Sequence, residues 1–332
     1  MSHILVTGGA GYIGSHTSRH LLAAGYQIVV LDNLYSGHRW AVPDEAIFIE
    51  GDAGSIETVD ALFKEYTISA IVHFAGHIVV PESVEDPLKY YENNCVVTQT
   101  LATQALKHGV EHMIFSSSAA VYGEPDELPV TESTLTNPIS PYGRTKLISE
   151  WMLEDVSRAN EQFDFVALRY FNVAGAALDG SLGQSTPEAT HLIKVACELV
   201  TQQRDKIALF GTDYPTEDGT CVRDYIHIED LAAAHVSALR YLQAGGGSNI
   251  FNCGYGQGFS VQQVLDCVAE IAQKDLNIET TGRRLGDPAE LIANNDKILQ
   301  ALDWLPKHND IRLICETALN WERHLASQHK NV

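Results

Sequence analysis

Short apolar runs alternate with longer stretches of helical periodicity through the first half of this chain. The runs are rich in β-forming residues and cover residues 4–7, 27–31, 46–50, 70–74, 112–116 and 165–169. Runs of this length predict strands, and the stretches between them predict helices. Repeated strand–helix–strand units predict an α/β fold with a doubly wound parallel sheet and helices on both faces.

The second half of the chain has a looser pattern. A stretch rich in Gly, Pro and Thr covers residues 211–219, and three consecutive glycines occupy 245–247. Helical periodicity predicts helices over 191–202, 229–242, 261–274 and 311–324. We therefore expect a second, smaller C-terminal domain beside the sheet.

Charge, hydropathy and cysteine usage narrow the class of protein. The 43 acidic and 22 basic residues give a net charge of -21, which disfavours nucleic acid and anionic membranes as partners. No apolar stretch approaches the roughly 20 residues needed to span a bilayer, and no secretion signal is visible, so we expect a cytoplasmic protein. The six cysteines include no Cys-x-x-Cys pair, so we expect neither disulfides nor a metal.

A glycine-rich turn between the first predicted strand and helix indicates a dinucleotide site. Gly8, Gly11 and Gly14 follow the Gly-x-x-Gly-x-x-Gly spacing, which lets the backbone approach a pyrophosphate at a helix N-terminus. Asp32 ends the second strand, 18 residues after Gly14, where a carboxylate can accept hydrogen bonds from a ribose. An acidic group there would repel the 2'-phosphate of NADP and so favours NAD. Arg39, a few residues later, keeps NADP as an alternative.

Three residues in the middle of the chain predict acid–base chemistry. Tyr142 and Lys146 are four residues apart and would project from one face of a predicted helix. The tyrosine pKa of about 10 makes it a poor base, but a nearby ammonium and a positive nicotinamide ring would lower that pKa. Tyr142 could then take a proton from a substrate hydroxyl, and Ser118 could form a hydrogen bond with the same hydroxyl. Lys146 could hold the nicotinamide ribose.

These motifs occur in the order typical of short-chain dehydrogenases/reductases. Over nearly its whole length the chain resembles the UDP-glucose 4-epimerase family among their extended members. The resemblance rests on residues 7–16, 31–34, 73–76, 116–123, 168–172 and, most specifically, the run 213–227. It implies a Rossmann-type NAD-binding domain over 1–171 and a mainly UDP-sugar-binding domain over 172–332. A segment near 224–253 is expected to return to the first domain.

The resemblance also implies a set of site residues. The catalytic residues would be Tyr142, Lys146 and Ser118. The NAD-binding residues would be Gly8, Gly11, Tyr12, Ile13, Gly14, Asp32, Asn33, Asp52, Ala53, Phe74, Ala75, Gly76, Asn93, Ser116, Tyr142, Lys146 and Tyr170. The substrate-binding residues would be Ser118, Tyr142, Asn172, His191, Leu192, Phe210, Arg223, Tyr225, Arg284, Asp287 and Leu291.

The implied activity is interconversion of UDP-galactose and UDP-glucose through a transient 4-keto sugar, by a homodimer with bound NAD. The alternatives are a 4-epimerase of UDP-N-acetylglucosamine, a UDP-pentose or a UDP-uronate, and a non-catalytic NAD-binding protein. A further alternative is a nucleotide-sugar dehydratase or decarboxylase of the same fold, and the elimination that a dehydratase performs is disfavoured. The positions where dehydratases typically carry an Asp-Glu pair hold Ala119 and Ala120.

The sequence departs from the resembled family at three places in the expected site. Ile78 stands where many members have a lysine, which changes the charge beside the nicotinamide. Thr190 and His191 replace a common asparagine pair, with His191 as the substitute contact to the substrate. Leu291 occupies the position that often decides whether N-acetylated sugars fit, and its size is intermediate.

Overall fold

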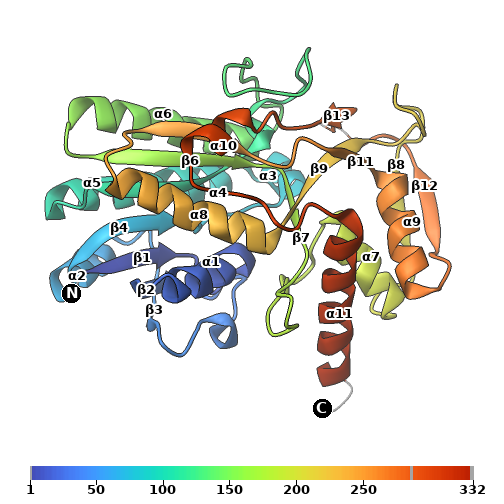
Figure 1. Ribbon diagram of the computed structural model, residues 1–332, viewed down its shortest axis with the longest axis horizontal. Coiled ribbons are helices and arrows are strands. Elements are labelled where there is room, and N and C mark those ends of the chain that lie inside the picture. Colours follow the sequence, from blue (N-terminus) through green and yellow to red (C-terminus); the bar gives the residue numbers. More distant parts are fainter. Residues whose placement is uncertain (1, 285–286, 330–332) are drawn as a thin grey trace.

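A seven-stranded, wholly parallel sheet forms the larger part of the molecule in the computed structural model, which describes residues 2–284 and 287–329. Its strand order is β10-β6-β5-β4-β1-β2-β3 (Figure 1). The strands are β1 His3–Thr7, β2 Gln27–Asp32, β3 Ile47–Glu50, β4 Ile68–His73, β5 His112–Ser118, β6 Asp164–Tyr170 and β10 Asn249–Cys253. The predicted doubly wound α/β fold is confirmed.

Alternation along the strands explains why both faces of the sheet are covered. Ile4 and Val6 of β1 point into one buried cluster, and Leu5 between them points into a second cluster on the other face. Helices α1 and α8 pack against each other on the first face, and α2, α5 and α6 line the second. Their bounds are α1 Tyr12–Ala23, α2 Ile56–Glu65, α5 Val97–His108, α6 Pro141–Ala159 and α8 Ile228–Gln243.

Smaller sheets and three mutually packed helices form the second region. A four-stranded sheet is centred on β9, which pairs with β7, β11 and β13, and a separate parallel pair joins β8 to β12. The strands are β7 Asn172–Ala174, β8 Ile207–Phe210, β9 Val222–His227, β11 Gly258–Ser260, β12 Ile278–Thr281 and β13 Glu290–Leu291. The packed helices are α7 Leu192–Val200, α9 Val261–Ala272 and α11 Ile311–His329 (Figure 1).

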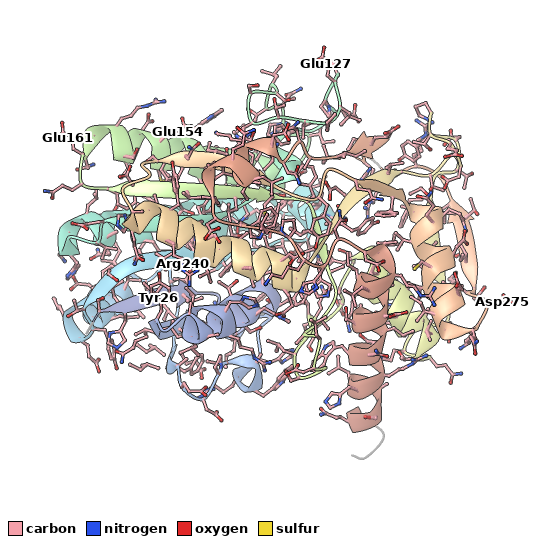
Figure 2. The ribbon with its side chains drawn as sticks, viewed as in Figure 1. Tyr26, Glu127, Glu154, Glu161, Arg240 and Asp275 are labelled. Atoms are coloured by element: carbon pink, nitrogen blue, oxygen red, sulfur yellow. The ribbon has the colours of Figure 1, made fainter. Side chains whose placement is uncertain are left out.

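The chain passes back from the second region to the large sheet after β9. The next helix, α8, packs on α1, and β10 then pairs with β6 at the sheet edge. Tyr26, which follows α1, donates a hydrogen bond from its hydroxyl to Gln243 of α8 at 2.8 Å. In Figure 2 side chains fill the space between the layers, whereas Glu127, Glu154, Glu161 and Asp275 project from the periphery.

Several short elements were not among those expected from the sequence. They include η1 Arg39–Ala41, α3 Val80–Glu85, α4 Pro87–Tyr90, η2 Tyr91–Val96, η3 Ala119–Val121 and α10 Asp296–Ala301. Three of them, α3, α4 and η2, follow one another between β4 and α5 and lie beside the carboxyl end of the sheet (Figure 1). That edge is where open parallel sheets place their ligands.

Candidate active site

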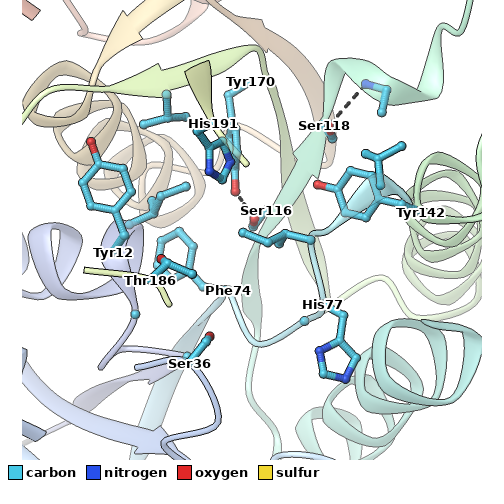
Figure 3. Close-up of a pocket in the computed structure, with 18 of the residues that line it drawn as sticks. Tyr12, Ser36, Phe74, His77, Ser116, Ser118, Tyr142, Tyr170, Thr186 and His191 are labelled. Carbon is cyan, nitrogen blue, oxygen red and sulfur yellow. Dashed lines mark hydrogen bonds between the residues drawn. The ribbon is translucent and has the colours of Figure 1, made fainter. Parts of the chain in front are cut away.

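A cavity of about 770 Å³ lies at the carboxyl ends of the parallel strands, between the sheet and the second region. Its wall on the sheet side comes from the segments that follow β1, β2, β4 and β5. On the other side it is lined by the ends of β7 and β9 and by the segment before β13. Figure 3 shows Tyr12, Phe74, Ser118, Tyr142, Tyr170 and His191 around this space.

The glycine turn leaves open backbone at one end of the cavity. Gly8 has a positive φ of 71°, and a Cβ placed on it would lie 2.6 Å from the Ala75 nitrogen. A Cβ on Gly14 would lie 2.2 Å from the Gly8 oxygen. Helix α1 begins directly after Gly11, which supplies no side-chain cap, so its first N–H groups are left for a ligand. This cradle fits a pyrophosphate, because only glycines permit so close an approach.

Asp32 lies at the next strand end and supports the same turn. Its carboxylate accepts hydrogen bonds from the backbone nitrogens of Ala10, at 2.9 Å, and Leu34, at 2.8 Å. Asp32 also lines the cavity, so it has both the turn-forming contacts of an ordinary Asp and the position expected for a ribose ligand. Other predicted cofactor residues line the same half, namely Tyr12, Ile13, Asn33, Asp52, Ala53, Phe74, Ala75, Gly76 and Asn93.

The three predicted catalytic residues come together at the ends of β5 and α6. Ser118 and Tyr142 both line the cavity. Lys146 is buried behind them, where its Nζ donates to the Ser116 carbonyl at 2.8 Å and lies 5.9 Å from the centre of the Tyr142 ring. Ser140 begins the helix by accepting a hydrogen bond from the Gly143 nitrogen, which positions Tyr142 in the first turn.

Burial governs the electrostatics of this cluster in the protein alone. Burial raises the pKa of Tyr142, and a hydrogen bond with Ser118 only partly opposes that rise. Burial also lowers the pKa of Lys146 to about 8, against a weaker upward influence of Cys95 and Glu150. The predicted lowering of the phenol pKa by Lys146 together with a positive nicotinamide ring stays a prediction, since in the protein without its cofactor the desolvation penalty is the larger effect. A further positive charge beside Tyr142 is needed to lower the pKa of its phenol.

The wall beside the catalytic cluster is built from stacked polar and aromatic groups. Ser116 and Tyr170, predicted cofactor residues on adjacent strands, share a short hydrogen bond through their hydroxyls (Figure 3). Phe74 packs on His235 of α8, with ring centres 4.8 Å apart. Burial raises the pKa of Tyr170, which keeps its hydroxyl protonated as a donor.

A buried ion pair ties the catalytic helix to the sheet. Glu150 of α6 forms two hydrogen bonds with Arg169 of β6, at 2.9 and 2.6 Å. The same carboxylate accepts a short hydrogen bond from Ser117, the neighbour of Ser118. Arg169 also donates to the Tyr122 hydroxyl at 3.0 Å. Because these side chains are almost fully buried, the network sets how α6 sits against β5.

The opposite half of the cavity carries the arginines. Arg223 of β9 lies 3.8 Å from Asp287, and Arg284 forms a closer pair with the same carboxylate at 2.9 Å. Arg283, which was not predicted, also lines this half and pairs with Asp213 at 2.8 Å. Every lysine or arginine among the described residues that line the cavity therefore lies in this half.

Most predicted substrate residues line the cavity, and three do not. Asn172, His191, Asp287 and Leu291 join the two arginines in its wall. Tyr225 and Leu192 line a smaller adjoining hollow instead. Phe210 lies at the end of β8, and the Arg284 guanidinium lies over its ring, 5.2 Å from the ring centre. Their predicted contacts with substrate remain predictions.

Several lining residues carried no sequence signal. Tyr35 and Ser36 follow β2, and Val80 to Glu85 form α3. Gln184 lines the cavity and contacts His191, with its Nε2 3.0 Å from the imidazole Nδ1. None belongs to a motif with a recognised spacing, because tertiary contact alone brings these residues to the site.

The described residues contain no group of three or more His, Cys, Asp or Glu side chains arranged to hold a metal ion. His16 and His20, four residues apart on α1, both contact Glu229 of α8, at 2.6 and 2.8 Å. This trio joins α1 to α8. None of the helices in residues 2–284 and 287–329 combines the length and apolar character that a bilayer crossing requires.

Comparison with known proteins places the chain in a class. The model of the NAD dependent epimerase/dehydratase family matches residues 4–254, and the chain belongs to that family. Within it, the chain belongs with the UDP-glucose 4-epimerases. The Azospirillum brasilense enzyme of that name is 50% identical over 322 residues, which cover 97% of this chain and 92% of the relative. The Lacticaseibacillus casei enzyme is 45% identical, covering 97% of each chain.

Solved structures agree. UDP-glucose 4-epimerase from Brucella ovis in complex with NAD superposes with a TM-score of 0.94 at 41% identity, covering 98% of this chain and 99% of that one. The Bifidobacterium longum enzyme in complex with NAD+ and UDP gives a TM-score of 0.92 at 35% identity, covering 97% and 98%. The resemblance inferred from the sequence is confirmed.

Proposed function

We propose that this protein is an NAD-dependent UDP-glucose 4-epimerase that interconverts UDP-galactose and UDP-glucose. The observation that carries the proposal is a single cavity with a glycine cradle at one end, arginines at the other and Ser118 and Tyr142 between them. A dinucleotide and a nucleotide sugar would enter from opposite ends. Their reacting groups would then meet at Tyr142.

In this mechanism the residues of the chain handle the proton. A dinucleotide held by the glycine cradle and Asp32 would supply a hydride acceptor, and then a hydride donor, for C4 of the sugar. Tyr142 removes the proton of the 4-hydroxyl and later gives it back, while Ser118 hydrogen-bonds the same oxygen. Lys146, held by the Ser116 carbonyl, adds a buried positive charge 5.9 Å from the phenol ring. The positive charge of the oxidised cofactor would supply the remaining stabilisation of the phenolate.

Inversion requires that the nucleotide be held firmly and the hexose loosely. Arg223 and Arg284 would bind the diphosphate, which competes with Asp287 for the same guanidinium groups. Between the two ends, where the hexose would lie beside Tyr142, the cavity is lined by small or apolar groups, among them Ala119, Ala120 and Leu291. Such a wall gives few hydrogen bonds to a turning sugar.

The cavity lining also weighs against elimination chemistry. A dehydratase needs an acid and a base beside the sugar C5 and C6. The carboxylates among the described lining residues are Asp32, Asp52, Glu85 and Asp287, and Ala119 and Ala120 occupy the positions next to Ser118. Epimerisation, which needs one group that cycles a proton, fits this wall better.

Incubation of the purified protein with single UDP-sugars, without added NAD, tests the proposal. We expect UDP-galactose to give UDP-glucose, identified by chromatography and NMR. UDP-N-acetylgalactosamine and UDP-xylose test for 4-epimerase activity on N-acetylated and pentose substrates. The intermediate size of Leu291 is compatible with either. No epimerised product from any of the three sugars, in a protein that carries NAD, would favour a non-catalytic role.

We propose a homodimer on the basis of exposed apolar side chains on α4, η2, α5 and α6, which pack against one another. Leu88 of α4 and Trp151 of α6 are 76% and 54% exposed, and Val96 and Leu106 are exposed on the adjoining segments. Large apolar side chains left exposed on neighbouring helices favour a protein interface. Sedimentation of Trp151→Glu against the parent protein tests it.

Two further assignments are proposals of the same kind. A cytoplasmic location is in keeping with six cysteines that are all free thiols. A division at residue 171, with 224–253 returning to the first domain, is supported by the pairing of β10 with β6 and the packing of α8 on α1.

A further inference from the structure

Two segments far apart in the sequence meet over the dinucleotide half of the cavity. Tyr35 and Ser36 follow β2 and form one wall, next to the predicted ribose ligand Asp32. His77, Ile78 and α3 follow β4 and form the wall that faces them. A dinucleotide that lies along the strand ends would pass between these two walls.

A hydrogen-bonded bridge connects the walls. The Lys89 ammonium of α4 donates to the Tyr35 hydroxyl at 3.2 Å, and its Nζ lies 5.4 Å from the centre of the Tyr35 ring. Tyr35 is 65% exposed and packs edge-on against the His77 ring at 4.9 Å. The bridge therefore lies on the solvent side of the cavity, with Tyr35 on one wall and Lys89 on the other.

The Lys89 end of the bridge is held in place by partly buried contacts on the α3–α4 wall. Lys89 forms a short ion pair with Glu82 of α3. The other oxygen of Glu82 accepts a hydrogen bond from the fully buried Tyr90 at 2.7 Å. Contacts with Lys89 and Tyr90 lower the pKa of Glu82, which therefore stays ionised and keeps Lys89 oriented at neutral pH. A lone surface ion pair would lack this support.

The Tyr35 end of the bridge belongs to the turn after β2, which carries the predicted ribose ligand Asp32. Tyr35 donates its backbone N–H to the Asn33 side chain at 3.0 Å, one residue from Asp32. The Tyr35 backbone is therefore part of the turn that carries the predicted NAD-binding residues Asp32 and Asn33. The bridge joins this turn to the wall beside Gly76, and a bound dinucleotide would be enclosed on its open side.

We propose that Tyr35 and Lys89 form a clasp that retains NAD between catalytic cycles, a positioning role that rests on the proposed function and adds two cofactor-retaining residues to it. The epimerase cycle regenerates the oxidised cofactor in place, so release is unnecessary for turnover. Opening the clasp is instead the step that limits cofactor exchange.

Exchange of labelled NAD from the loaded holoenzyme tests the clasp. Tyr35→Phe removes only the hydroxyl that accepts from Lys89, and Lys89→Met removes the cation while keeping an unbranched side chain. We expect each to speed NAD dissociation about fivefold or more, which corresponds to about 1 kcal/mol. The double variant should be no faster than the faster single variant, because both changes break the same bridge. Lys107→Met is the matched control, since Lys107 pairs with Asp60.

Turnover with UDP-galactose in saturating NAD separates the clasp from the chemistry. The Lys107→Met control should keep both kcat and the NAD dissociation rate within about twofold of the parent, whereas in the clasp variants the fold-change in the NAD dissociation rate should exceed any fold-change in kcat. An NAD dissociation rate unchanged in both variants would overturn the inference even if epimerisation is found. Faster exchange in a protein without epimerase activity would support the clasp and refute the proposed function.

Discussion

Tyr142 shows how much a single phenol depends on its surroundings. In the protein alone, burial raises its pKa, and burial also lowers the pKa of the nearby Lys146 to about 8. The phenol therefore remains protonated until a cation is placed beside it. In the proposed mechanism this cation is the oxidised cofactor, so the base would be active only when hydride can be accepted.

Tyr142→Phe deletes the proton-transferring oxygen and little else. We expect epimerisation of UDP-galactose to fall by about 100-fold or more, in line with the contribution of a positioned acid–base group. NAD content and affinity for UDP should be retained because the ring still fills its place in the wall. Near-normal turnover in this variant would remove Tyr142 from its assigned role.

Arg223 tests the anchor of the nucleotide. Arg223→Ala removes a cation from the arginine half of the cavity, and a charged hydrogen bond contributes about 1.5–3 kcal/mol. We expect affinity for UDP to fall by about tenfold to 100-fold, as measured by titration calorimetry, with NAD content unchanged. Arg312→Ala is the control, because Arg312 pairs with Glu270 on the surface of the second region. Equal affinities in the two variants would contradict the assignment.

At the scale of elements, the position of α6 matters most, since this helix carries both Tyr142 and Lys146. The Glu150–Arg169 pair ties it to β6, and Ser117 ties the same carboxylate to β5. Burying two charges gives little net stability, but leaving one of them unpaired is costly. The pair therefore acts chiefly as a constraint on how the helix and the strand ends are aligned.

Arg169→Met should lower the free energy of unfolding by about 3–5 kcal/mol, because it leaves the Glu150 carboxylate buried and unpaired. Glu150→Leu combined with Arg169→Met should recover a large part of that loss, as measured by urea unfolding. Arg158→Met is the control, since Arg158 lies on the exposed face of the same helix and its loss should change stability by less than about 0.5 kcal/mol. Equal stabilities of the two single variants would refute the constraint.

The elements that the sequence predicted are those whose pattern is local. Residues such as Ile4, Leu5 and Val6 are buried on alternating faces, so an unbroken apolar run predicts a strand of a covered parallel sheet. The segment 80–96 was missed because Pro81, Pro87 and several charged residues interrupt any periodicity. Its short helices are held by tertiary contacts with α6.

At the scale of the whole molecule, the same distinction explains how much of the site could be predicted. Gly8, Asp32, Ser118 and Tyr142 belong to motifs with recognised spacing, and all four line the cavity. Tyr35, Gln184 and Arg283 do not, because folding across separate segments places them there. The pKa of Tyr142 could not be predicted for a related reason, since the desolvation that governs it depends on packing from several elements.

Buried histidines make the stability of the whole molecule sensitive to acid. Burial lowers the pKa of His73 to about 3 and those of His227 and His235 to about 4. Between these values and about 6.5 the unfolded chain binds protons that the folded chain does not, so the free energy of unfolding falls as pH falls. Asp224, whose pKa burial raises to about 6, acts in the opposite direction over part of this range.

His235→Phe isolates one of these contributions. His235 donates from Nδ1 to the Leu231 carbonyl at 2.8 Å, whereas its buried Nε2 has no partner among the described residues. A phenylalanine ring fills the same space against Phe74, so stability at pH 7 should change by only about 1 kcal/mol. Because the histidine no longer titrates, the loss of stability between pH 7 and 5 should be smaller by about 2 kcal/mol. Urea unfolding at pH 7 and pH 5 measures this difference in the free energy of unfolding. His324→Phe is the control, because His324 is exposed. An unchanged pH slope in His235→Phe would show that this imidazole is not held neutral by the fold.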